Sequence, residues 1–182
     1  MTHEEARQRH LERERDARAK LDQRLTKPEQ QAIKSAVLKA RTLCALLMGP
    51  TGIGKTSSAL YLTRHVRGCW VRAIELAAAE RQHELGRGWA PLIERAREAV
   101  VTVIDDVGQE KDPSALFDVL DWRYSHQLPT IVTTGLTQQQ LTAHLGAAGV
   151  RRIVDQHVPM PKREGEEMPV LIVDCHLPRG SK

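Results

Sequence analysis

Residues 49–56 constrain this chain more than any other segment, because they match the phosphate-binding pattern G-x-x-x-x-G-K-[ST]. The apolar run 42–48 before them predicts a short strand, and residues 56–66 behind them carry apolar side chains at helical spacing. A strand, a glycine-rich bend and a helix start in this order turn backbone N–H groups and the helix dipole toward a phosphate chain. The segment therefore predicts a site for a nucleoside triphosphate.

Each residue type in this segment has a role in that chemistry. Lys55 is expected to reach the β- and γ-phosphates, and the Thr56 hydroxyl is expected to hold Mg²⁺. The residues expected to surround ATP are Gly49, Pro50, Thr51, Gly52, Ile53, Gly54, Lys55, Thr56 and Ser57.

The rest of the chain alternates predicted strands and helices. We expect strands at 69–74, 100–104, 130–134 and 170–173, and helices at 28–41, 77–84, 91–97, 113–126 and 137–145. Such alternation predicts an α/β fold with a mostly parallel sheet, helices on both faces, and the ligand at the carboxyl ends of the strands.

Two acids follow the third predicted strand. Asp105 is predicted to hold Mg²⁺ through water, and Asp106 to orient or deprotonate an attacking water. Asp-Asp before Gly108 is also ordinary turn chemistry, but the phosphate motif upstream favours the catalytic interpretation. At the end of the next strand, Thr133 and Thr134 both qualify as a group that contacts the γ-phosphate or the attacking water.

Residues 1–27 differ in composition from the rest of the chain. Charged side chains of both signs occur there at helical spacing, with few large apolar residues. We expect a solvated helix that contributes little to a core, and that is either a docking helix for a partner or an arm without a role. Thr26 is expected to cap the next helix, with Glu29 three residues later. The nucleotide-binding core is expected over 28–178, with a tail at 179–182.

The composition bounds the possible classes further. A net charge of +4 permits contact with nucleic acid, whereas 3% aromatic residues argue against a surface built mainly of base-stacking rings. No run approaches the roughly 18 apolar residues of a membrane span, and we expect no secretory signal. The three cysteines lie in apolar runs, so we expect buried thiols, a reducing compartment and a cytoplasmic location.

The phosphate motif is followed in order by five further segments, at residues 73–76, 104–108, 121–124, 129–136 and 150–153. Together they resemble the DnaC/IstB-like branch of the AAA+ ATPases, which includes replicative helicase loaders and ATP-binding helpers of some transposons. The resemblance covers about residues 30–175. It implies a P-loop NTPase of AAA+ type, with a five-stranded parallel sheet in the order 5-1-4-3-2 and no C-terminal lid domain. It also implies nucleotide bound between subunits, with Arg152 or Arg151 reaching a neighbour's γ-phosphate.

The chain departs from the family at two places. The polar sensor after the fourth strand is usually Asn there, whereas Gly135 occupies that position here, so Thr134 is the candidate for this role. Residues 155–157 stand where the family often has another arginine, so no second arginine there can take over the role expected of Arg152. These departures point to slow hydrolysis.

The resemblance implies an ATP-dependent loader of a replicative helicase. It would use Mg²⁺, form homo-oligomers on single-stranded DNA, and dock the helicase through residues 1–27. The expected DNA-contacting element is 75–97, which carries arginines that also suit a solvated helix face: Arg81, Arg87, Arg95 and Arg97. The alternatives are an IstB-like transposition helper that grips duplex DNA and a weakly hydrolysing nucleotide switch. A small-molecule P-loop kinase is disfavoured, because helix 137–145 carries no arginine to close over phosphates.

Overall fold

The computed structural model describes residues 3–83, 89–160 and 165–176, so the expected tail at 179–182 and Arg87 lie outside the described residues. Within these ranges no helix is both long and apolar enough to cross a membrane. The helices and strands are α1 (His3–Ala19), α2 (Leu21–Arg24), α3 (Pro28–Ala40), β1 (Ala45–Met48), α4 (Lys55–Leu62), β2 (Gly68–Arg72), α5 (Ala73–Gln82), α6 (Pro91–Glu98), β3 (Val101–Val107), α7 (Ser114–Ser125), β4 (Thr130–Thr134), α8 (Gln138–Val154) and β5 (Leu171–Asp174).

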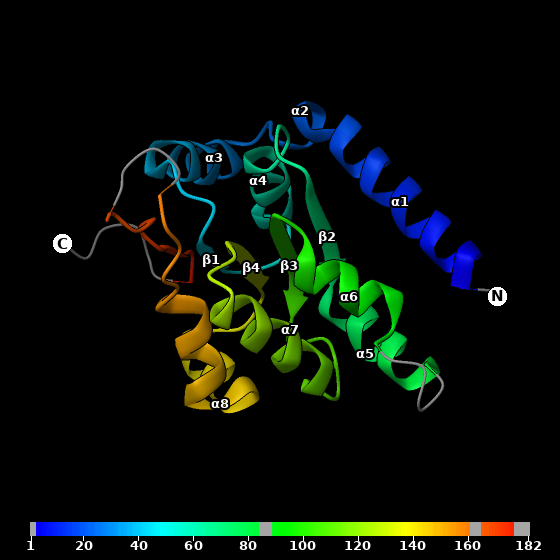
Figure 1. The fold of residues 1–182 in the computed structure, drawn as a ribbon. Helices are drawn as coiled ribbons and strands as arrows, with labels where there is room; N and C mark the ends of the chain where they lie inside the picture. The colour runs from blue at the N-terminus through cyan, green and yellow to red at the C-terminus, as the bar shows by residue number, and fades with distance from the viewer. Residues whose placement is uncertain (1–2, 84–88, 161–164, 177–182) are drawn as a thin grey trace.

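The five strands form one parallel sheet in the order β2-β3-β4-β1-β5. Counted from the other edge this is the expected order 5-1-4-3-2, and the α/β prediction is confirmed. Figure 1 shows α3 and α4 on one side of the sheet and α5, α7 and α8 on the other. Because all strands are parallel, their carboxyl ends meet at one edge, where the phosphate motif follows β1.

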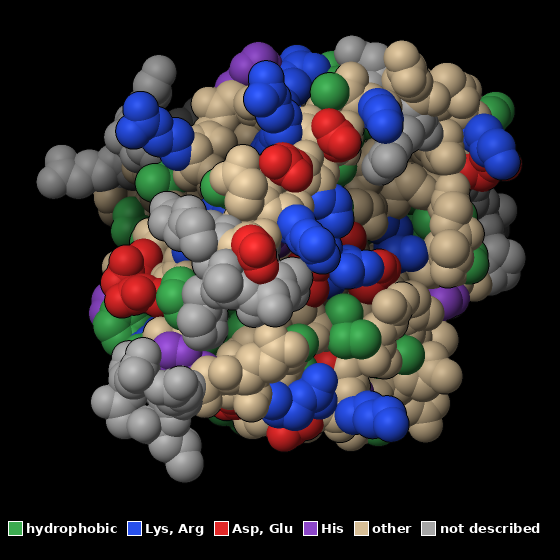
Figure 2. Space-filling view, turned by 90° about the vertical axis from the view of Figure 1, so that its right-hand side faces the viewer, with side chains coloured by type: hydrophobic (Ala, Val, Ile, Leu, Met, Phe, Trp, Pro, Cys, Tyr) green, Lys and Arg blue, Asp and Glu red, His purple; other side chains and the backbone are tan. Residues whose placement is uncertain are grey.

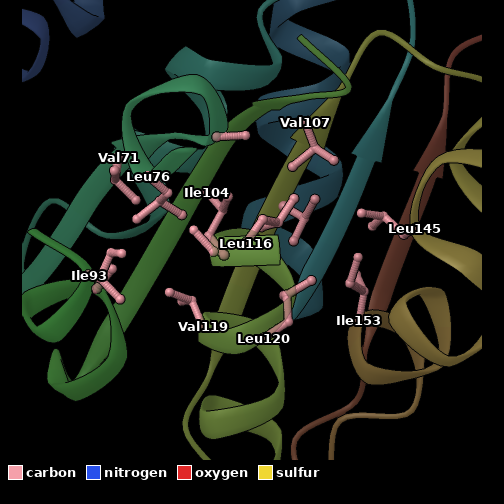
Figure 3. Close-up of a cluster of buried hydrophobic side chains, with 14 of the residues drawn as sticks. Val71, Leu76, Ile93, Ile104, Val107, Leu116, Val119, Leu120, Leu145 and Ile153 are labelled. Carbon is pink, nitrogen blue, oxygen red and sulfur yellow. The ribbon is translucent and has the colours of Figure 1, made fainter. Parts of the chain in front are cut away.

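The sheet separates two apolar cores, because successive strand residues point to opposite faces. One core joins the strands to α5, α6, α7 and α8, with Ile104 and Val132 among its strand residues (Figure 3). The other joins them to α1, α2, α3 and α4, with Val103 and Ile131 on the strands. This alternation also decides which polar residues at the strand ends face α4.

Several expected boundaries differ from the structure. Strand β2 ends at Arg72, so Ala73 and Ile74 begin α5. Helix α8 continues to Val154 through a kink at Gly146.

The predicted cap of α3 by Thr26 is wrong by one residue. Lys27 is the N-cap, and the side-chain oxygen Oε1 of Gln30 accepts the backbone N–H groups of Thr26 and Lys27. A Gln three residues after the cap closes the helix start in the same way as the expected Glu.

Helix α1 packs on the body of the protein, and the expectation that this region contributes little to a core is wrong. Ala17, Leu21 and Leu25 are buried, and the first two lie in the core shared by α3 and α4. Glu14 is buried as well and pairs with Arg95 of α6. The N-terminal helices thus cover the α4 side of the molecule, while the domain boundary after residue 27 stays a prediction.

Candidate nucleotide site

The phosphate loop is a tight bend that requires glycine. Gly54 starts α4 with φ +91°, a left-handed conformation that other residues rarely adopt. At Gly49, a Cβ atom would lie 2.5 Å from Ile53 Cδ1 and 2.8 Å from Cys175 Cβ. The backbone that joins β1 to α4 therefore requires glycine at both Gly49 and Gly54.

A pocket of about 390 Å³ opens above this loop, within the usual range for ligand sites. The expected residues Gly49, Pro50 and Ile53 are not among those that line it. The pocket brings together four separate segments of the chain. It is lined by Gln30, Thr51, Gly52, Gly54, Lys55, Thr56, Ser57, Asp106, Val107, Gly108, Gln109, Gly135 and Leu136.

Lys55 is held beside the pocket without an anionic partner. Its Nζ donates to the carbonyl oxygens of Gly49 at 2.7 Å and Pro50 at 2.9 Å, and it forms no ion pair within the described ranges. Burial lowers the pKa of Lys55, against the opposing influence of Asp106 and Asp105. A buried ammonium bonded only to carbonyls fits a phosphate ligand, which would supply the missing negative charge.

Asp105 is buried and oriented by three donors. Its Oδ1 accepts the hydroxyls of Thr56 at 2.7 Å and Thr133 at 2.5 Å, and its Oδ2 accepts the indole N–H of Trp70 at 3.2 Å. The Thr56–Asp105 bond joins the start of α4 to β3. A hydroxyl and a carboxylate are hard oxygen donors of the kind Mg²⁺ prefers, so this pair fits the expected metal ligands.

Asp106 reaches the pocket through an irregularity in β3. The register between β3 and β4 shifts between Ile104 and Val107, and Asp106 has φ +55°. Such a bulge redirects a side chain that regular alternation would send to the other face. Burial and the neighbouring Asp105 raise the pKa of Asp106, whereas Lys55 lowers it. A raised pKa suits a group that must accept a proton from water.

The two threonines at the end of β4 point to opposite faces of the sheet. Thr133 faces α4, donates to Asp105 and accepts the backbone N–H of Asp106. Thr134 is fully buried, donates to the carbonyl of Val107 at 2.6 Å and does not line the pocket. The sensor role of Thr134 stays a prediction, and it requires the hydroxyl to leave Val107.

The arginines singled out by the sequence lie away from the pocket. Arg152 is bonded to Asp121 on α7, and Arg151 is exposed, so an action in a neighbouring subunit stays a prediction. The guanidinium carbon of Arg97 lies 4.3 Å from the ring centre of Trp89 and 4.0 Å from that of Trp122. Arg81 is exposed, and a role of these side chains in DNA contact also stays a prediction.

Two site residues were missed by the sequence analysis. Gln30 of α3 donates to the carbonyl of Gly52 at 3.0 Å and so ties α3 to the phosphate loop. Trp70 of β2 donates to Asp105. Neither belongs to a nucleotide-binding motif, and both act at the site through contacts between elements far apart in the sequence.

The order of the strands and the phosphate loop after β1 are those of the AAA+ P-loop fold. The chain is similar to a solved DnaC helicase loader, with TM-score 0.56, 18% identity, and coverage of 82% of this chain and 92% of that one. A DnaI structure matches with TM-score 0.54 and 21% identity over 71% of this chain and 80% of that one. DnaA from Aquifex aeolicus, bound to AMPPCP, matches with TM-score 0.51 and 20% identity over 68% of this chain.

The chain spans 42% of that DnaA chain, less than half its length. No protein-family model matches the sequence, and no curated protein matches it significantly. At these identities the likeness establishes the fold, and it confirms the predicted resemblance to DnaC-like AAA+ proteins at that level.

Proposed function

We propose that this protein binds ATP with Mg²⁺, hydrolyses it slowly, and acts in DNA replication as a loader of a replicative helicase. Two neighbouring features carry the proposal. The hydroxyl of Thr56 is hydrogen-bonded to Asp105, and the ammonium group of Lys55 beside them has no anionic partner among the described residues. A triphosphate supplies that anion, and its metal needs the two oxygens. The DnaC and DnaA neighbours support replication as the setting.

Each residue of the site has a separate task in this proposal. Lys55 exchanges the carbonyls of Gly49 and Pro50 for phosphate oxygens, while Thr56 and Asp105 hold the metal. Bound Mg²⁺ neutralises the phosphate charge during transfer. Asp106 lines the same pocket and accepts the proton of the attacking water.

The similar structures support the partners in this proposal. One neighbour is a DnaC helicase loader, and a DnaA neighbour is bound to AMPPCP and single-stranded DNA, matching with TM-score 0.54 and 17% identity. Arg152 does not line the pocket of its own chain, so in this proposal it acts in a second copy. We therefore propose that ATP drives self-association on single-stranded DNA.

The test is size-exclusion chromatography with light scattering, with and without ATP, single-stranded DNA and a replicative helicase. The proposal predicts that ATP and DNA together produce a larger species that comigrates with the helicase. Lys55→Ala should abolish this shift, because the buried ammonium is lost, whereas Lys39→Ala on the exposed face of α3 should leave it unchanged. If the protein binds ATP but stays a monomer under all of these conditions, the loader role is refuted and the ATP site is not.

One observation favours a nucleotide switch as the second candidate. Gly135 provides no side chain at the expected sensor position, and Thr134 is engaged by Val107. ATP binding without turnover, even with DNA and helicase present, would support the switch.

A further inference from the structure

Trp70 is the one described residue that donates a hydrogen bond to Oδ2 of Asp105. Its side chain is 6% exposed and lies on the α4 face of β2, the same face as Asp105. The other oxygen of Asp105 is shared by Thr56 and Thr133. Because a carboxylate rotates about its terminal bond, a donor on Oδ2 is needed to fix the plane in which Oδ1 faces Thr56.

Helix α1 holds the tryptophan ring from the outside. The guanidinium carbon of Arg13 lies 4.7 Å from the centre of the Trp70 ring, a cation–π distance. Arg13 is itself fixed, because it donates to both carboxylate oxygens of Glu75 on α5. A continuous chain of contacts thus runs from α1 through Trp70 to Asp105.

Besides the buried Ala17, helix α1 is attached by polar contacts along this face. Glu14 pairs with Arg95 of α6 and with Arg18, and Arg18 donates to Thr63 of α4. Figure 2 shows the molecule from this side, where Lys and Arg side chains lie interspersed with Asp and Glu side chains. An attachment by ion pairs is weakened by salt and by competing charges, unlike one made by a wide apolar face.

We propose that Trp70 is a positioning residue for Asp105, and that helix α1, through Arg13, sets how well the site accepts Mg²⁺. This inference rests on the proposed function, since it concerns the metal side of the same site. When Arg13 covers the ring, the indole N–H stays on Oδ2 and the carboxylate faces Thr56. When α1 is displaced, the ring gains freedom and the metal ligands lose their alignment.

The test measures Mg²⁺ dependence of nucleotide binding, independently of turnover. A fluorescent ATP analogue is titrated in EDTA, and Mg²⁺ is then titrated into the complex. Trp70→Phe keeps an aromatic ring but removes the N–H donor. We expect the Mg²⁺ needed for half-saturation to rise roughly 10- to 100-fold, as for other residues that orient metal ligands. Affinity in EDTA should stay within about twofold, because Trp70 is not among the residues that line the pocket.

A matched pair on α1 separates the role of Arg13 from a general charge effect. Arg13→Gln should raise the half-saturating Mg²⁺ concentration on the order of threefold to tenfold, since it acts through Trp70. Arg15→Gln removes the same charge from an exposed position of the same helix and should have no effect. In a Trp89→Phe, Trp122→Phe background, the emission of Trp70 should change when Mg²⁺ and nucleotide bind.

The outcomes distinguish this inference from the proposed function. If the unmodified protein binds nucleotide without any Mg²⁺ dependence, the assignment of the metal pair fails. If Mg²⁺ strengthens binding equally in the unmodified protein and in Trp70→Phe, the positioning role is refuted. Equal effects of Arg13→Gln and Arg15→Gln would refute the link through α1.

Discussion

Acidification should destabilise the folded protein, because His10 of helix α1 is buried and its pKa is lowered. Burial and the nearby Arg13, Arg95 and Arg72 lower the pKa of His10 from 6.5 to about 4. Carboxylate oxygens of Glu14 and Glu75 lie 4.0 Å and 3.8 Å from the ring and act in the opposite direction, but they do not outweigh burial and three arginines.

The sign and size of the effect follow from this depressed pKa. At about pH 7.5 and above, the folded and unfolded forms both carry neutral His10, and its contribution to stability is complete. As the pH falls through 6.5 toward 4, the unfolded chain takes up a proton that the folded chain refuses, so stability is lost. Between about pH 7.5 and about pH 5 the loss amounts to about 2 kcal/mol.

The assay is urea unfolding of the unmodified protein and of His10→Gln at both pH values. Glutamine does not titrate, so the unmodified protein should lose about 2 kcal/mol more than the variant on acidification. The comparison with the variant removes the contribution of every other titrating group. Equal losses in the two proteins would refute the assignment of a neutral, buried His10.

The remaining predictions concern catalysis and the core. Asp106→Asn should leave ATP affinity within about twofold and stop turnover; normal turnover by this variant would exclude Asp106 as the base. A Cβ at Gly135 meets nothing within 4 Å, so Gly135→Asn should fold normally and raise ATP turnover about tenfold or more, measured by phosphate release. An unchanged rate would show that this position does not sense the γ-phosphate. Arg123 is fully buried and donates to the carbonyls of Ala96, Arg97, Ala99 and Pro129. Arg123→Met should lower the free energy of unfolding by about 3 kcal/mol or more in urea denaturation, and a loss below about 1 kcal/mol would contradict this structural role.

Much of the fold could be predicted because its signals are local. The phosphate loop needs glycine where the backbone turns, and the apolar runs mark the buried strands, so the α/β alternation follows from the sequence. The order of the strands came from the resemblance, since nothing local specifies which strand lies beside β1. It agrees with the structure.

The interior of the site was harder to predict. Alternation along β4 places Thr133 with Ile131 on the α4 face, and this parity would have favoured Thr133 over Thr134 as the residue near Asp105. The bulge that redirects Asp106 has no local signal, because it depends on the register between β3 and β4.

The packing of α1 shows the limit of reading one segment at a time. Its charges look solvated in isolation, but Arg13 and Glu14 find their partners in Glu75 and Arg95, 62 and 81 residues away. Only the folded chain brings these charges together, so a local pattern of mixed charge cannot distinguish a solvated helix from a docked one.

The central claim is that Mg²⁺ and a triphosphate bind where β1 turns into α4. The most direct measurement is a crystal structure with Mg²⁺ and a non-hydrolysable ATP analogue. The account predicts phosphates over residues 51–56, the Lys55 ammonium moved from the carbonyls of Gly49 and Pro50 to a phosphate oxygen, and the metal beside Thr56 and Asp105. An analogue bound elsewhere, with Lys55 still on those two carbonyls, would contradict it.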